Sequence, residues 1–331
     1  MADGNKAAHR MLLGFVRLAI GIALLVYLAE SQIIDFRTLA KLATAWPITL
    51  AALALIFLDI TFMALRLCWL FRPQGLQLPF IRSLELTLVS SFFTTFLPGA
   101  AGGDLAKLFY AAKENKGRRT EIVTIVAFDR VVGLFSLLLL PLLFAPLFSG
   151  LIRSERVLQN LLITAAALAV CSLGAFSLCL INPPWMNRAA QWVSRLLPGR
   201  KVPERVLATM GVYRTNARFL FAALGASLVS NLILIVATAL AIVVVSPNSL
   251  SLKMCLVVPL GDVANGLPLT PGGLGVGETA FNALFKVVGL QGGAEAILCW
   301  RIWRALVGLV GLILYLRGVG RVVFDTQEGG G

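Results

Sequence analysis

The chain has 331 residues, of which 58% are hydrophobic and only 14% are charged, and 29 Lys and Arg against 16 Asp and Glu give it a formal net charge of +13. A soluble domain carries about a quarter charged residues and less than half apolar ones. The composition therefore excludes both a soluble globular protein and a disordered one. It predicts an all-α, polytopic membrane protein, since helices satisfy their backbone hydrogen bonds within a bilayer.

The composition also excludes several kinds of chemistry. The single histidine, His9, lies in the polar N-terminal segment, whereas Ser-His-Asp catalysis and His-ligated metal sites need a histidine within the fold. The five cysteines lie in apolar runs without metal-ligand spacing. We therefore expect no catalytic residue, no metal and no cofactor. Because the basic residues lie in short loops between apolar runs, we expect anionic lipid rather than nucleic acid as the partner.

Six apolar runs are long enough to cross a bilayer, which takes about 20 residues of helix. They lie near residues 12–29, 47–66, 122–148, 158–181, 217–246 and 294–317. Two further apolar stretches, 84–97 and 254–267, are shorter, and each runs into a cluster of Gly and Pro that cannot continue a helix. We expect these two stretches to turn back as re-entrant hairpins.

The basic residues orient the predicted spans. With the N-terminus in the cytoplasm, six crossings and two re-entrant hairpins place most of the 29 Lys and Arg on the cytoplasmic side. If either hairpin crossed the membrane fully, every later loop would change sides and this asymmetry would weaken. Both termini are therefore expected in the cytoplasm. The loop 183–216 alternates basic with apolar residues and predicts an amphipathic helix on the inner leaflet.

The two short stretches share the pattern L-P-x-x-x-G-G followed by a carboxylate. Three full crossings separate them, so the halves 12–148 and 158–317 are predicted to form an inverted repeat within one transmembrane domain, 1–320, followed by a disordered tail, 321–331. Broken helices at the interface of inverted repeats are typical of transporters and indicate the substrate site. The motif residues are Pro98, Gly102, Gly103 and Asp104 in the first half, and Pro268, Pro271, Gly272, Gly273 and Glu278 in the second.

Ionisable residues within a span cost a few kcal/mol each, so they pair or serve a function. Arg130, Arg301 and Arg304 fall within predicted spans. Two interpretations stay open, namely interhelical ion pairs that fix packing, and a site for an anionic head group. In the second, the arginines attract phosphate and the glycine turns supply backbone N–H donors. The protein carboxylates considered as partners of Arg304 are Glu278, Asp262 and Asp129.

The stretch Pro98–Asp104, the adjacent Asp129 and Arg130, and the stretch Pro268–Glu278 resemble the lysylphosphatidylglycerol synthase transmembrane family, also called flippase-like, over roughly residues 12–320. The resemblance implies a non-enzymatic lipid translocase of the bacterial inner membrane, which moves an anionic or aminoacylated phospholipid or a polyprenyl-phosphate-linked lipid between leaflets. No residues correspond to the soluble aminoacyl-transferase domain of the fused members, so we expect no lipid lysylation. Thr94, Thr95 and Ala101 depart from the family pattern and leave the head group open.

The candidate lipid-binding residues combine the charged and the helix-breaking positions. Two alternatives to a translocase remain. One is a non-transporting scaffold or regulator of a lipid-modifying enzyme or glycosyltransferase. The other is a membrane enzyme such as a glycosyltransferase, although the first outside loop offers only Glu30 and Asp35 as metal ligands. The candidate site comprises Arg130, Arg301, Arg304, Glu278, Asp104, Asp129, Asp262, Pro98, Gly102, Gly103, Pro268, Pro271, Gly272 and Gly273.

Overall fold

The fold is seen in a computed structural model that describes most of the chain after residue 35. Within the described residues every regular element is helical, which confirms the all-α class. The first predicted span, 12–29, and the predicted tail, 321–331, lie outside these residues. The described ranges are 36–76, 78–96, 101–115, 117–181, 184–196, 202–267, 270 and 273–317.

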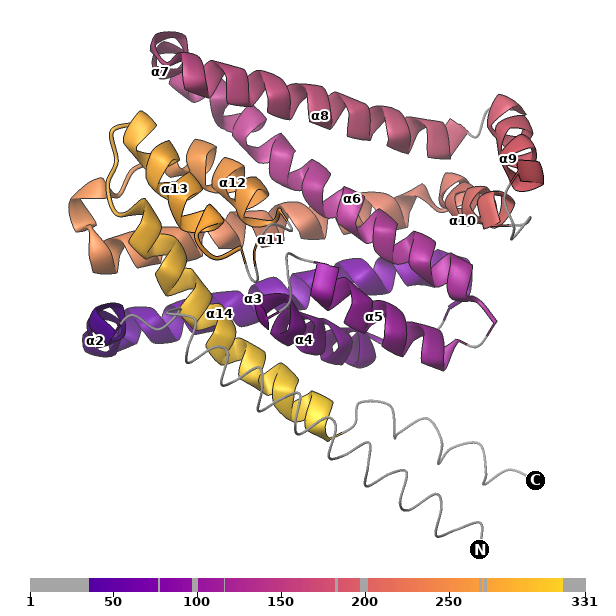
Figure 1. Ribbon diagram of the computed structural model, residues 1–331, viewed down its shortest axis with the longest axis horizontal. Helices are drawn as coiled ribbons and strands as arrows, with labels where there is room; N and C mark the ends of the chain where they lie inside the picture. The colour runs from indigo at the N-terminus through magenta and orange to yellow at the C-terminus, as the bar shows by residue number, and fades with distance from the viewer. Residues whose placement is uncertain are drawn as a thin grey trace, which may run out of the picture.

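Five helices are long and apolar enough to cross a membrane. Each coincides with a predicted span, so five of the six spans are confirmed as helices of membrane length. In Figure 1, α3 and α11 run side by side along the long axis, and α6 and α14 cross them obliquely. Large apolar side chains such as Phe57 and Val170 remain exposed on these helices, as expected of surfaces that face lipid. The five are α3 (Trp46–Phe71), α6 (Arg119–Phe144), α8 (Arg156–Ile181), α11 (Ala217–Val245) and α14 (Gly293–Leu316).

The two short apolar stretches form two pairs of packed helices. The first pair is α4 (Phe80–Phe96) with α5 (Ala101–Glu114), and the second is α12 (Met254–Asn265) with α13 (Val276–Val287). The breaks between the helices fall within the Gly and Pro clusters, as the sequence predicts. In Figure 1 the two pairs extend from opposite ends of the bundle, and the helix ends next to the breaks lie near its middle.

In each helix pair, a basic residue at the start of the first helix bonds to the end of the second helix, opposite the break. Arg82 of α4 forms an ion pair with Glu114 at the end of α5, and Lys253, just before α12, donates through Nζ to the Val288 carbonyl beyond α13 at 2.8 Å. Near the first break, Gly103 lets α5 lie directly on α4, because a Cβ there would collide with Ser90. Each pair is therefore joined at the end opposite its break, and the first pair also packs closely near its break.

Short helices cap the two ends of the bundle. One end carries α2, η2, α7 and η3, and the other carries η1, α9 and α10 (Figure 1). On α9 the exposed Trp185 and Trp192 lie seven residues apart on one face, while Ala190 is buried on the opposite side. These short helices are α2 (Phe36–Thr44), η1 (Arg72–Gln74), η2 (Ala145–Phe148), α7 (Ser149–Ser154), α9 (Pro184–Leu196), α10 (Val202–Thr215) and η3 (Pro247–Ser249).

Tyr213 holds α10 against the end of α3. Its hydroxyl donates to the Leu70 carbonyl at 2.6 Å, and its ring stacks on Phe128 of α6. Burial raises the pKa of Tyr213, so the hydroxyl stays protonated and remains a donor at physiological pH. The loop between α8 and α11 is thereby anchored to the spans.

Candidate functional site

A cavity of about 690 Å³ lies where the two helix pairs meet the spans. Its walls come from α3, α4, α5, α6, α8, α11, α12 and α14, so both halves of the sequence contribute. Charged groups of both signs line it, which is costly within a bilayer and indicates either pairing or function. The basic residues are Arg66, Lys107, Arg130, Arg301 and Arg304, and the acidic residues are Asp59, Asp104, Asp129 and Asp262.

Asp129 is fully engaged by protein cations. Arg66 donates to its carboxylate through Nε at 2.6 Å and through Nη2 at 3.1 Å, and Lys107 Nζ lies 3.5 Å away. Arg66 also donates to the Ser227 hydroxyl at 2.7 Å. All of these groups are buried, and such a bidentate pair offsets much of the free energy lost on desolvation. Asp129 therefore links α3, α5 and α6, as the interpretation of structural ion pairs expects.

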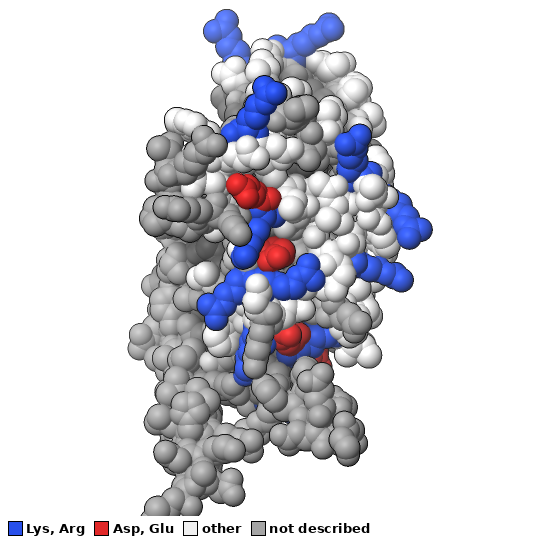
Figure 2. Space-filling view, turned by 90° about the vertical axis from the view of Figure 1, so that its right-hand side faces the viewer, with Lys and Arg blue, Asp and Glu red and all other residues white. Residues whose placement is uncertain are grey.

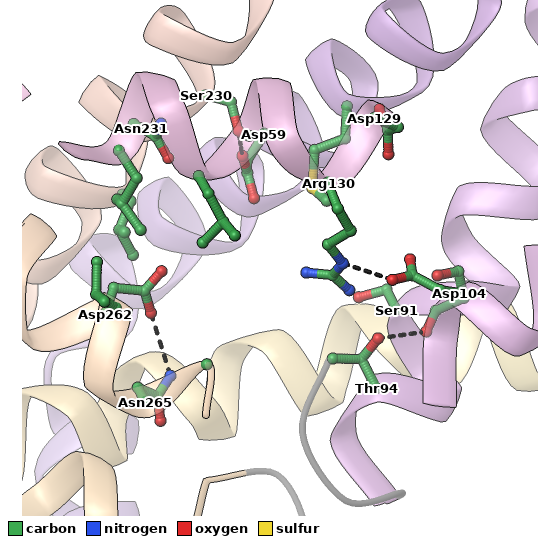
Figure 3. Close-up of a pocket in the computed structure, with 18 of the residues that line it drawn as sticks. Asp59, Ser91, Thr94, Asp104, Asp129, Arg130, Ser230, Asn231, Asp262 and Asn265 are labelled. Atoms are coloured by element: carbon green, nitrogen blue, oxygen red, sulfur yellow. Dashed lines mark hydrogen bonds and ion pairs between the residues drawn. The ribbon is translucent and has the colours of Figure 1, made fainter. Parts of the chain in front are cut away.

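Arg130, the next residue, faces the cavity. Its Nε lies 2.5 Å from Asp104 Oδ2 on α5, yet 41% of its side chain remains exposed. Figure 3 shows Arg130 reaching from α6 towards Asp104, with Asp262 and Asn265 on the other side of the pocket. Of the predicted arginines, Arg130 has the side chain with the largest exposed fraction.

Arg301 is held entirely by the second helix pair. It donates to Glu278 Oε1, to Asn265 Oδ1 and to the Gly273 carbonyl, each at 2.6 Å. Only 6% of its side chain is exposed. Gly277 gives it room, because a Cβ at that position would collide with the guanidinium. Arg301 therefore fixes the tip between α12 and α13 and presents little surface to a ligand.

The described glycines of the turn do not offer the N–H donors that the sequence predicts. Gly273 donates to the Thr270 carbonyl at 3.1 Å, and Gly277 donates to the Gly273 carbonyl at 2.9 Å. Gly275 donates to the second oxygen of Glu278 at 2.7 Å. These three amides are used within the turn, which needs glycine at Gly273 and Gly275 because φ is +72° and +77°. The glycines thus shape the tip around Arg301.

Arg304 has a different partner from those considered in the sequence. Its Nη1 lies 3.8 Å from Asp59 Oδ2 on α3, and its guanidinium lies over the Trp300 ring, 4.9 Å from the centroid. Ser230 of α11 also donates to Asp59. None of Glu278, Asp262 and Asp129 pairs with Arg304 among the described contacts. The pair with Asp59 is looser than the other arginine pairs of the cavity.

Asp262 is the one acidic residue of the cavity lining that has no described ion pair. Asn265 donates to it through Nδ2 at 3.1 Å, and no ion pair within 4 Å joins it to a described Lys or Arg. Asn265 therefore bridges two charges, since its Oδ1 accepts from Arg301. Asp262 therefore lines the cavity without a described cation within 4 Å.

The structure thus brings six predicted residues to the lining of one cavity, and four more are described outside that lining. Glu278 and Gly273 accept hydrogen bonds from Arg301 but do not line the cavity. Gly102 and Gly103 are buried in α5. Pro98, Pro268, Pro271 and Gly272 lie outside the described residues. The six lining residues are Arg130, Arg301, Arg304, Asp104, Asp129 and Asp262.

Sequence reasoning missed several lining residues. Arg66, Lys107 and Asp59 line the cavity but are not among the predicted site residues. Hydroxyl side chains along α4 form a polar stripe that the sequence could have revealed, since they recur at a spacing of four within an apolar stretch. They are Ser90, Ser91, Thr94 and Thr95.

These features define a multi-pass α-helical membrane protein with a charged cavity between its spans. The family model described as the lysylphosphatidylglycerol synthase TM region matches residues 14–314, and the chain belongs to that family. The predicted family resemblance is thereby confirmed. Comparison with curated proteins and with solved structures gives no match.

Proposed function

We propose that this protein is a lipid translocase that moves an anionic or aminoacylated lipid between leaflets and catalyses no covalent reaction. The supporting observation is the partly exposed side chain of Arg130 in a cavity between membrane-length helices and the two helix pairs. A guanidinium binds phosphate through a bidentate fork. The head group enters the cavity and the acyl chains remain in the bilayer.

The mixed charge of the cavity supports a head group that also carries an amine. Arg130 and Arg304 face a phosphate, while Asp262 faces an ammonium group. An aminoacylated phospholipid carries both charges. A plain anionic phospholipid or a polyprenyl phosphate would bind through the arginines alone. Transport of an aminoacylated lipid should therefore depend on Asp262, and transport of a lipid without an amine should not.

For the membrane topology we propose six crossings and two re-entrant hairpins, α4–α5 and α12–α13, related as an inverted repeat, with both termini in the cytoplasm of a bacterial inner membrane. The opposed helix pairs support this arrangement (Figure 1). The end that carries α9 and α10 is rich in blue residues in Figure 2 and becomes the cytoplasmic end. Its bases are Arg72, Arg82, Lys113, Arg118, Arg119, Arg188, Arg205, Arg214, Arg218 and Arg317, against Lys41, Arg153, Arg156, Lys253 and Lys286 at the other end.

The proposal is tested in vesicles of phosphatidylcholine and phosphatidylglycerol that contain NBD-labelled phosphatidylglycerol. Dithionite quenches the label in the outer leaflet, and the protein is expected to speed the loss of the remaining signal relative to protein-free vesicles. Arg130→Ala should abolish this gain, and Arg153→Ala, an exposed residue of α7, should keep it. Lysyl-phosphatidylglycerol carrying the same label tests the aminoacylated class.

A scaffold or regulator of a lipid-modifying enzyme is the second candidate. The close pairing of Arg66, Arg130 and Arg301 with protein carboxylates favours it, because a cavity held by ion pairs is also expected of a static structure. If no tested lipid moves faster than in protein-free vesicles, the scaffold replaces the translocase.

A further inference from the structure

The charged cavity continues into an apolar space between α6, α8 and α11. Leu134, Leu137 and Leu138 of α6, Leu168 of α8 and Leu234 of α11 line the same cavity as the arginines. Together these five leucines form the leucine wall. The space therefore has a charged part and an apolar part without a boundary between them.

The change from charged to apolar follows one face of α6. Arg130, Leu134, Leu137 and Leu138 are spaced by four, three and one residues, so they form a single stripe of the helix. From Arg130 to Leu138 the stripe rises about 12 Å. A ligand bound to Arg130 by its charged end would therefore have its apolar part along this stripe.

The same change occurs on α11 and in the same direction. Ser230 and Asn231 are followed one turn later by Leu234. Both α6 and α11 begin beside α10, so both become apolar with increasing distance from that end (Figure 1). Two helices from different halves of the chain thus define one polar-to-apolar axis.

On the side of α8, the apolar part of the cavity opens towards the membrane. Leu134 and Leu168 are 47% and 48% exposed although they line the cavity, whereas Leu137 and Leu138 are each 6% exposed. The helix α8 packs on α6 through buried small and apolar residues such as Ala165 and Ala169. Leu168 therefore lies at the margin between the cavity and the lipid-facing surface.

We propose that the leucine wall is a lateral portal that holds an acyl chain of the lipid whose head group lies at Arg130. This inference rests on the proposed function and adds to it the route of entry. An amphiphile with a charged end and an apolar chain matches a cavity that is charged at one end, leucine-lined at the other and open to the bilayer beside Leu134 and Leu168. A water-soluble ligand would gain nothing from the apolar half.

Tryptophan substitutions test whether the portal carries the chain. Leu168→Trp and Leu134→Trp fill the opening and should slow transfer of NBD-labelled phosphatidylglycerol about tenfold. The matched variants Leu173→Trp on α8 and Leu143→Trp on α6 change leucines that are 53% and 56% exposed but do not line the cavity. They should transfer lipid at the wild-type rate.

Binding of the chain-free head group separates a blocked portal from a damaged head-group site. Glycerophosphoglycerol, titrated into the detergent-solubilised protein, should bind the portal variants as it binds wild type. If it no longer binds, or if the lining and control variants transfer lipid equally, the portal is wrong while the translocase stands. A wild-type protein that transfers no lipid would instead refute the proposed function.

Photolabelling locates the chain directly. Phosphatidylglycerol with a diazirine in its acyl chain should form adducts at Leu137 and Leu138, which bulk lipid does not reach because they are buried. Leu140, also buried at 3% exposure but outside the cavity lining, should stay unlabelled. Adducts confined to exposed residues such as Leu173 would overturn the portal.

Discussion

Arg301 of α14 donates to Glu278 of α13 at 2.6 Å, and the same contact type joins Arg130 of α6 to Asp104 of α5 at 2.5 Å. In each half, an arginine on the span after the helix pair contacts the carboxylate that follows the Gly-Gly sequence. By local sequence pattern, Arg130 (R-V-V-G-L) would instead align with Arg304 (R-A-L-V-G-L). Within the proposed inverted repeat, the contact geometry makes Arg301 the counterpart of Arg130.

The two counterparts differ in exposure, and this difference predicts different roles. Arg301 is 6% exposed, so removing it leaves Glu278, Asn265 and the Gly273 carbonyl without their cation. Arg301→Ala is expected to lower the free energy of unfolding by about 3–5 kcal/mol, as for other broken buried pairs. Thermal unfolding in detergent, followed by size-exclusion fluorescence, measures the loss.

The double variant Arg301→Met with Glu278→Gln is the control for this stability effect. It removes both charges, so it should recover part of the stability lost by Arg301→Ala. Arg153→Ala, at an exposed site on α7, should unfold like wild type. An Arg301→Ala protein that unfolds at the wild-type temperature would show that the contacts of Arg301 do not hold the tip.

The sequence predicted the helices well because their signals are local. A run of about 20 apolar residues specifies a span without reference to its neighbours, and Gly and Pro clusters specify a break. The end of a span is less well defined. The second span was expected to end at residue 66, but α3 continues to Phe71. This continuation places Arg66 more than one turn inside the helix and buries it against Asp129.

The charge partners could not be predicted from local patterns. Asp59 and Arg304 come from opposite ends of the described chain, and they meet only because α3 packs on α14. Likewise, Arg66 forms its ion pair with the buried Asp129, although Asp59 is nearer in the sequence. Which carboxylate pairs with which arginine depends on helix packing, so the sequence identified six of the nine charged lining residues but not their contacts.

The proposed topology predicts which loops are reached from outside the cell. In a cysteine-free background, Asn248→Cys and Gln291→Cys lie at the end that carries η3 and should react with an impermeant maleimide in intact cells. Thr215→Cys and Arg119→Cys lie at the end that carries α10 and should react only after permeabilisation. Reaction of Arg119→Cys in intact cells would show that the α4–α5 pair crosses the membrane rather than returning.

Asp262 is expected to set the choice between aminoacylated and plain anionic lipids. Its carboxylate has one amide donor and no described ion pair within 4 Å, so it can bind an ammonium group. A charge-assisted hydrogen bond contributes about 1.5–3 kcal/mol. Asp262→Asn should therefore slow transfer of labelled lysyl-phosphatidylglycerol about tenfold or more and leave phosphatidylglycerol unaffected. Equal slowing of both lipids would assign Asp262 to the fold rather than to selectivity.

Variants of Arg304 distinguish a ligand-binding role of this residue from a structural role. Its nearest carboxylate oxygen, on Asp59, lies 3.8 Å away, and Trp300 covers one face of the guanidinium. Arg304→Ala should abolish lipid transfer and reduce stability much less than Arg301→Ala, because Asp59 keeps the hydrogen bond from Ser230. Arg304→Lys should restore transfer only partly, since a lysine lacks the bidentate fork for phosphate.

A structural role of Arg304 would be recognised from the stability of variants at Asp59. If the pair with Asp59 is the main role of Arg304, Arg304→Ala strands a carboxylate of which 12% is exposed and should cost about 3–5 kcal/mol of unfolding free energy. Asp59→Asn in the same chain would then restore the unfolding temperature. A phosphate-binding role instead predicts that the double variant is as stable as Arg304→Ala and still transfers no lipid, because the group that binds phosphate is gone. Parallel measurement of unfolding and of NBD-lipid transfer on these variants decides between the two.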